Sequence, residues 1–168
     1  MEEEENRFDE DERLTRAQEL FQQAYEFQAA GKYDRAIRLY QESIETYPTA
    51  EAHTFLGWTY SFQGRLDEAI AECHKAIEVD PDFGNPYNDI GVYLMQKGQL
   101  DQAISWLEKA KQAPRYEPRH FPYLNRGRIH VAHGQWLEAI KEFAKAVEIE
   151  PKDPGARKAL AELRARLN

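Results

Sequence analysis

Residues 52–81 read AHTFLGWTYSFQGRLDEAIAECHKAIEVDP and indicate the fold more clearly than any other segment. Gly57 stands seven positions before Gly64, and Ala69 stands five positions after it. Spacings of three, four and seven between small and apolar residues place them on one face of a helix. A glycine ends a helix easily in the left-handed conformation, and a proline stops the helix that follows. The stretch therefore predicts two helices joined by a tight turn at Gly64.

The same arrangement occurs four times along the chain. The turn segments are GKYDRAI from Gly31, GRLDEAI from Gly64, GQLDQAI from Gly98 and GQWLEAI from Gly134, so the glycines are 33, 34 and 36 residues apart. A fixed period in this range is typical of stacked helical repeats. Since one helix pair cannot bury its apolar face alone, the pairs are expected to stack on one another.

On these residues the chain resembles the tetratricopeptide repeat, a helix–turn–helix unit of about 34 residues. The resemblance covers residues 17–151, and NPYNDIGVYLMQKGQLDQAISWLEKA, from Asn85 to Ala110, is a second nearly complete unit. It implies an all-α fold, a right-handed solenoid of antiparallel helix pairs. The expected organisation is a single domain over 14–168, with repeats at 17–49, 50–83, 84–117 and 120–153 and a cap helix at 154–167.

Charge is concentrated at the start of the chain. The net charge of the 168 residues is −8, and residues 1–13, MEEEENRFDEDER, contain eight acids and two arginines. Such a segment has little apolar surface to pack, so residues 1–13 are predicted to be a disordered acidic tail. The cap helix contains outward-facing basic residues that suit the negative end of a helix.

Composition excludes several classes of function. The chain lacks the concentrated basic footprint of a nucleic-acid binder. Cys73 is the one cysteine, which excludes an internal disulfide and a multi-cysteine zinc site. No apolar run approaches the ~20 residues of a membrane span, and no secretory signal is visible. We expect no nucleic-acid partner, no membrane contact and a cytoplasmic location.

No set of residues with catalytic spacing is found. His130 and His133 are three residues apart without a third ligand at a recognised spacing, and Cys73 stands where the other repeats place Tyr40, Leu107 and Phe143. Phosphate-cradling, metalloprotease and nucleophile-elbow motifs are absent. The sequence therefore predicts a protein that is not an enzyme and that uses no metal and no cofactor.

The first helix of each pair carries side chains that the repeat core does not use. In a tetratricopeptide-like stack these side chains line a concave groove. Apolar surface left unused by the core often marks a binding site, and amides can both donate and accept hydrogen bonds. The predicted peptide-binding groove residues are Phe21, Gln22, Tyr25, Phe55, Trp58, Phe62, Asn88, Asp89, Asn125 and Arg128. The competing interpretation is that some of these aromatic side chains pack between neighbouring first helices.

The predicted function is a scaffold that binds a partner peptide or protein segment in this groove. The alternatives are a chaperone for a secreted or unassembled client and a regulatory subunit of an enzyme complex. The carboxylate clamp of chaperone-binding relatives is not expected, because the matching positions hold Phe21, Tyr25 and Phe55, then Asn85 and Asp89, without a basic residue. Trp106 lies on the outer face of its helix, which indicates a possible homo-oligomer contact unless the neighbouring loop covers it.

Overall fold

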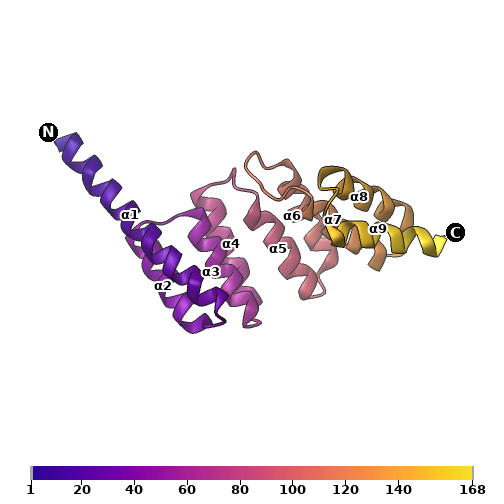
Figure 1. The fold of residues 1–168 in the computed structure, drawn as a ribbon, viewed down its shortest axis with the longest axis horizontal. Coiled ribbons are helices and arrows are strands. Elements are labelled where there is room, and N and C mark those ends of the chain that lie inside the picture. The colour runs from indigo at the N-terminus through magenta and orange to yellow at the C-terminus, as the bar shows by residue number, and fades with distance from the viewer. Residues whose placement is uncertain (1, 168) are drawn as a thin grey trace. The chain divides into compact units, whose positions relative to one another are not determined.

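The computed structural model describes residues 2–167, and all nine elements in that part of the chain are α-helices (Figure 1). The predicted all-α class is confirmed. The helices are α1 Glu2–Ala29, α2 Tyr33–Thr46, α3 Ala50–Phe62, α4 Leu66–Val79, α5 Asn85–Gln96, α6 Leu100–Gln112, α7 Phe121–Ala132, α8 Trp136–Ile149 and α9 Pro154–Leu167.

The chain divides into two compact units. The N-terminal unit, Met1–Phe83, contains α1 to α4, and the C-terminal unit, Gly84–Asn168, contains α5 to α9. The sequence had suggested one domain over 14–168. Since each repeat touches mainly its neighbours, a repeat array has no central core that would unite it.

Each helix pair is joined by a tight turn on a glycine. Gly31, Gly64, Gly98 and Gly134 have φ between 70° and 76°, the left-handed region predicted for these positions. At the second turn, the Gly64 amide donates to the Ser61 carbonyl at 2.9 Å, and the Arg65 amide donates to the Tyr60 carbonyl at 3.0 Å. These bonds satisfy carbonyls that the end of α3 leaves open.

Small residues let the two helices of a pair approach closely. Gly127 of α7 lies against the ring of Phe143 on α8, where a Cβ atom would overlap the ring, and Gly91 lies against Leu107 in the same way. Cys73 is fully buried, which confirms its interpretation as a core residue. The alanines that follow each turn glycine by five residues are also fully buried: Ala36, Ala69, Ala103 and Ala139.

The acidic start differs from the prediction. Residues 2–13 form the beginning of α1, which extends past α2 in Figure 1, whereas disorder was expected for 1–13. Glu and Arg are good helix formers, and the helix is tied to the end of α2. The Arg13 guanidinium donates to the Thr46 carbonyl at 2.9 and 3.1 Å, and the Tyr47 hydroxyl bonds the Glu10 carboxylate at 3.2 Å. The side chains of residues 7–13 are exposed, in agreement with their low apolar content.

The segment between α6 and α7 covers part of the C-terminal unit. It contains a cis peptide bond between Glu117 and Pro118. The Tyr116 side chain is buried against Gly84, whose amide donates to the Arg115 carbonyl at 2.8 Å. This segment therefore packs the start of α5 against the end of α6.

Candidate functional site

Five aromatic side chains on α1 and α3 form the largest group of predicted site residues. We call Phe21, Tyr25, Phe55, Trp58 and Phe62 the aromatic surface. Tyr25, Trp58 and Phe62 are 45%, 42% and 55% exposed, and Phe21 and Phe55 are half-buried. The competing interpretation, that these rings are hidden between helices, applies in part to Phe21 and Phe55 and is wrong for the other three.

Phe55 organises the aromatic surface. Its ring meets those of Phe21, Tyr25 and Trp58 edge to face, with centroid distances of 5.1, 5.9 and 5.3 Å. Such edge-to-face pairs are favourable beyond the area they bury. The exposed rings of Tyr25 and Trp58 therefore both pack edge to face against the half-buried ring of Phe55.

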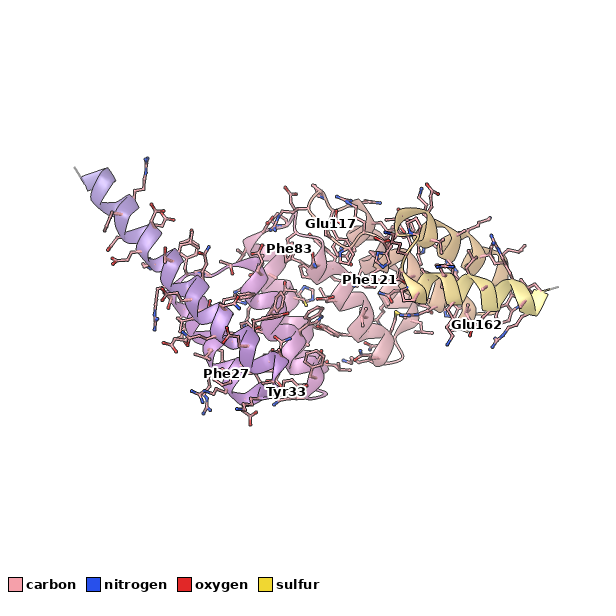
Figure 2. The ribbon with its side chains drawn as sticks, viewed as in Figure 1. Phe27, Tyr33, Phe83, Glu117, Phe121 and Glu162 are labelled. Atoms are coloured by element: carbon pink, nitrogen blue, oxygen red, sulfur yellow. The ribbon has the colours of Figure 1, made fainter. Side chains whose placement is uncertain are left out.

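Phe62 belongs to a second contact near the turns. Its ring stacks on Tyr33 at the start of α2, with a centroid distance of 5.4 Å and an interplanar angle of 28°. Figure 2 shows Phe27 and Tyr33 at the end of this unit where α1 turns into α2. Phe62 is thus more than half exposed while its ring packs on Tyr33.

The buried side-chain amide of Gln28 on α1 contacts α2 and α3 beside the aromatic surface. The Tyr40 hydroxyl donates to Gln28 Oε1 at 2.7 Å. The Thr59 hydroxyl, which donates to the Phe55 carbonyl at 2.8 Å, lies 3.3 Å from the same Gln28 oxygen. Burial raises the pKa of the Tyr40 hydroxyl, which therefore stays protonated as a donor. Gln22, by contrast, is exposed and can reach a ligand.

A hollow of about 220 Å³ adjoins Phe21 between α1, α2 and α3. The Ser43 hydroxyl at its wall donates to the Ala17 carbonyl at 2.7 Å, and the Thr49 side chain caps α3 by accepting from the Ala52 amide at 3.1 Å. These polar groups are already paired, so the hollow suits a small apolar side chain. It is lined by Ala17, Gln18, Phe21, Ser43, Thr49 and Glu51.

In the C-terminal unit the predicted site residues are largely buried, which corrects the expectation that they face a groove. Asn88, Asp89 and Asn125 are each less than a tenth exposed, whereas Arg128 is exposed. Arg128 donates to Asn125 Oδ1 at 3.1 Å, Asn125 donates to Asn88 Oδ1 at 3.1 Å, and Asn88 donates to Asp89 Oδ1 at 3.5 Å. We call these four residues the amide chain. Because its members satisfy one another, Arg128 is the group a ligand can reach.

Burial changes the protonation of the amide chain. It raises the pKa of Asp89 to about 7, with the hydrogen bond from Asn88 acting in the opposite direction. Burial, together with the nearby Asp89 charge, raises the pKa of the Tyr116 hydroxyl. The site can therefore hold a neutral carboxyl group near neutral pH.

The histidines and the outer tryptophan have structural partners. His130 Nδ1 lies 2.6 Å from Gln135 Oε1, and His133 Nε2 lies 3.5 Å from Asp101 Oδ1. Over residues 2–167, no group of three or more His, Cys, Asp and Glu side chains is placed to hold a metal ion. Trp106 is half-buried, with Tyr87 at 6.2 Å between centroids and the Lys109 ammonium 4.3 Å from its ring.

Sequence reasoning missed a buried charged group. His53 Nδ1 lies 2.7 Å from the Glu72 carboxylate, which also accepts from Lys75 Nζ at 2.7 Å. Burial works to raise the pKa of Glu72, but the bonds from His53 and Lys75 outweigh it and leave the pKa lowered. Nothing local in the sequence links His53 to Glu72, since they meet only when α3 and α4 pack.

Three family models, each described as tetratricopeptide repeat, match residues 21–83, 63–120 and 120–163. Among curated proteins, the small glutamine-rich tetratricopeptide repeat-containing protein 2 of Mycosarcoma maydis is 29% identical over 59% of this chain and 28% of its own length. The rat mitochondrial import receptor subunit TOM70 is 27% identical over 77% of this chain and 21% of its own length. The chain thus spans less than a third of the length of these relatives.

Solved structures support the fold. Pseudomonas aeruginosa PilF is 21% identical with a TM-score of 0.84, covering 92% of this chain and 70% of its own. TTC0263 of Thermus thermophilus is 26% identical with a TM-score of 0.72, over 90% of this chain and 83% of its own. The first repeat domain of Spaghetti (RPAP3), bound to the HSP90 peptide SRMEEVD, is 24% identical with a TM-score of 0.63, over 71% of this chain and 93% of its own. No helix in residues 2–167 has the length and apolar character to cross a membrane.

Proposed function

The chain belongs to the tetratricopeptide repeat family, whose members mediate protein–protein interactions, and from this premise we propose that it is a non-enzymatic interaction module that holds a segment of a partner protein on the aromatic surface. The observation that carries the proposal is the exposure of Tyr25, Trp58 and Phe62, at 45%, 42% and 55%, on a packed ring framework. Large apolar side chains left accessible in this way typically mark interaction sites.

Binding energy comes from rings that are ordered before the partner arrives. Tyr25 and Trp58 rest against Phe55, and Phe62 rests on Tyr33, so little side-chain freedom is lost on binding. Tryptophan and tyrosine are the residues most often found as interface hot spots. Apolar side chains of the partner would lie between these rings.

Polar groups beside the rings suit an extended backbone. Gln22 and Gln18 are exposed on α1, and an amide can donate to a carbonyl and accept from an N–H of the same peptide. The hollow beside Phe21, of about 220 Å³, would take a small apolar side chain of that peptide. The preferred ligand is therefore an extended segment with alternating aromatic or aliphatic side chains.

This chemistry differs from capture of a chain terminus. The RPAP3 domain was solved with an HSP90 peptide ending in EEVD, an acidic sequence. Here the positions matching a carboxylate clamp hold Phe21, Tyr25 and Phe55 in the N-terminal unit. Aromatic rings gain more from apolar side chains than from carboxylates, so an apolar internal segment is the proposed ligand.

A chaperone for a labile client would use the same surface, and one finding favours keeping this as the second candidate. Hsp70-Hsp90 organizing protein 3 of Arabidopsis thaliana is 26% identical to this chain over 95 residues. A chaperone would bind many unrelated apolar segments weakly, whereas a scaffold would prefer one sequence.

The test is selection of ligands from a displayed library of random peptides, followed by titration of an enriched peptide. Trp58→Ala combined with Phe62→Ala should weaken binding by about a hundredfold, because two exposed rings are removed. The control is Trp136→Ala in the C-terminal unit, since Trp136 is 40% exposed and Trp58 is 42% exposed. Binding unaffected by the double variant, or lost equally in the control, would contradict the proposal. Enrichment of many unrelated apolar peptides would favour the chaperone.

A further inference from the structure

A second surface lies at the end of the C-terminal unit, where α7, α8 and α9 meet. It is a pocket of about 390 Å³, which we call the α7–α9 pocket. Phe143 and Leu163 are buried in the core below it, and Val131 and Ala159 are half-buried at its wall. The interior of the pocket is therefore apolar and large enough for an aromatic side chain.

The rim of the α7–α9 pocket is positively charged. Arg128, Lys158 and Arg166 line it together with one acid, Glu162, which is labelled on α9 in Figure 2. Lys158 and Glu162 lie 3.9 Å apart with side chains 76% and 61% exposed, so solvent screens this pair strongly. Three cations against one carboxylate leave the rim positive, which favours an acidic ligand with an apolar centre.

The chain itself contains a segment with that chemistry. Phe8 is 73% exposed on α1. The exposed acids Asp11 and Glu12 follow it by three and four residues. Helical spacing puts these positions on one face around Phe8. We call Phe8, Asp11 and Glu12 the acidic face of α1, an aromatic ring beside two acids.

We propose that the acidic face of α1 in one copy of this chain docks into the α7–α9 pocket of a second copy. Phe8 enters the apolar interior, and Asp11 and Glu12 face Lys158, Arg166 and Arg128 at the rim. This is a helix bound in a groove, a common mode of recognition. The segment is already part of helix α1 before it docks, and the bonds from Arg13 to the Thr46 carbonyl attach that helix to the end of α2. Little conformational entropy is therefore lost when the segment binds.

The contact is heterologous, because it joins two different surfaces. Each copy carries one acidic face and one pocket, so a docked pair still offers one of each to further copies. Association should therefore proceed beyond dimers as concentration rises. It should also weaken with salt, because the rim charges are exposed and screened.

Sedimentation velocity of the full chain over a concentration series tests the proposal. The wild type should form species larger than a dimer at about 0.05 M salt and revert toward monomer at about 0.5 M. Phe8→Ala with Asp11→Asn and Glu12→Gln removes the acidic face, and Lys158→Glu with Arg166→Glu reverses the rim. Each variant alone should remain monomeric, with circular dichroism confirming that it is helical.

Mixing the two variants gives the sharpest result. The rim variant keeps its acidic face and the face variant keeps its pocket, so the mixture should form a 1:1 dimer and nothing larger. The control is Arg157→Glu with Arg164→Glu, which reverses two exposed arginines of α9 that do not line the pocket. It should assemble like the wild type.

Three results would overturn the proposal. The first is that the wild type stays monomeric at low salt. This result counts against the proposal even if the pocket binds a synthetic glutamate-rich helix, because the ligand of the pocket would then be a different protein and not a second copy of this chain. The second is a salt-dependent change in sedimentation that does not vary with protein concentration, which indicates contact within one chain. The third is a variant mixture that yields no dimer.

Discussion

The two units hold different residues at the same positions of the repeat. Whether a side chain is exposed or buried depends on the position and on the unit. Six residues before the turn glycine stand Tyr25 and Trp58 in the N-terminal unit and Arg128 in the C-terminal unit, and all three are exposed. Nine residues before it, Gln22 is exposed and Phe55 is half-buried, whereas Asp89 and Asn125 are buried. The first of these positions is exposed at Tyr25, Trp58 and Arg128 and half-buried at Val92, whereas the second is buried only in the C-terminal unit.

This contrast distinguishes side chains that are available to a partner from side chains that hold the helices together. Aromatic side chains at the accessible position are available to a partner, as on the aromatic surface. At the position nine residues before the turn glycine, Asn125 of α7 and Asp89 of α5 are joined through Asn88, which bonds to both. Such a buried hydrogen-bonded network favours one register of packing. The position nine residues before the turn glycine therefore holds Gln22 and Phe55 of the proposed binding surface in the N-terminal unit and a buried polar network in the C-terminal unit.

The largest expected effect is on the pH dependence of the C-terminal unit. Burial raises the pKa of Asp89 to about 7, while an unfolded aspartate titrates near pH 4. The folded state then holds a proton that the unfolded chain has lost, so the free energy of unfolding falls as pH rises from about 4 to 7, by up to ~1.4 kcal/mol per pH unit. Asp89→Asn should remove this slope and stabilise the unit above pH 7.

Urea unfolding of wild type and Asp89→Asn across that pH range measures the effect. Asp82→Asn, which changes an exposed acid in the N-terminal unit, is the matched control and should keep the wild-type slope. Identical slopes in the wild type and Asp89→Asn would mean that Asp89 is ionised in the folded unit.

The next effect concerns the ring that organises the aromatic surface. Phe55→Ala should destabilise the N-terminal unit by about 3 kcal/mol, because its ring contacts Phe21, Tyr25 and Trp58. Binding of a selected peptide should also weaken.

Trp58→Ala should reduce binding by about 2 kcal/mol with little change in stability. Thermal melts beside peptide titrations separate these outcomes, and equal stability losses would place Trp58 in the core.

A smaller effect is expected in the amide chain. Asn125→Ala removes the acceptor of the Arg128 guanidinium. It also leaves the buried side-chain oxygen of Asn88, Oδ1, without the hydrogen bond that Asn125 donates. The cost should be about 1–3 kcal/mol of stability. Peptide affinity should be unchanged, because the ligand lies on the aromatic surface. Chemical denaturation and titration of the same sample check both, and a tenfold loss of affinity would move the binding site into the C-terminal unit.

The smallest effect is expected at the exposed amide of the N-terminal unit. Gln22→Ala should weaken peptide binding by about 0.5–1.5 kcal/mol, the net value of one hydrogen bond, and leave the melting temperature unchanged. Its counterpart in the repeat is Asn125, so the pair of alanine variants compares an exposed and a buried amide at one position. A loss of stability in Gln22→Ala would contradict this comparison, because the exposed amide would then contribute to folding as the buried amide of Asn125 does.

Much of the fold could be predicted because its signals are local. The turn glycines, the alanines that follow them and Cys73 occupy the conformations and burial expected from spacing alone. The helical start of α1 was missed, because composition indicates whether a segment can pack but not that Arg13 and Glu10 reach the end of α2. Of the predicted site, Tyr25, Trp58 and Phe62 are exposed as expected, whereas Asn88, Asp89 and Asn125 are not.

The helix pairs, their order and the apolar face of each helix follow from local sequence patterns, because helical periodicity and the left-handed turn depend on residues close together in the chain. Which of the remaining side chains are exposed to solvent depends instead on how the helices pack together. Burial of Asn125 or exposure of Trp58 depends on the helix packed beside it, and hydrogen bonds such as those of the amide chain join residues far apart in sequence. The α7–α9 pocket arises for the same reason, since Arg128 and Arg166 come together only when α9 packs on the last helix pair.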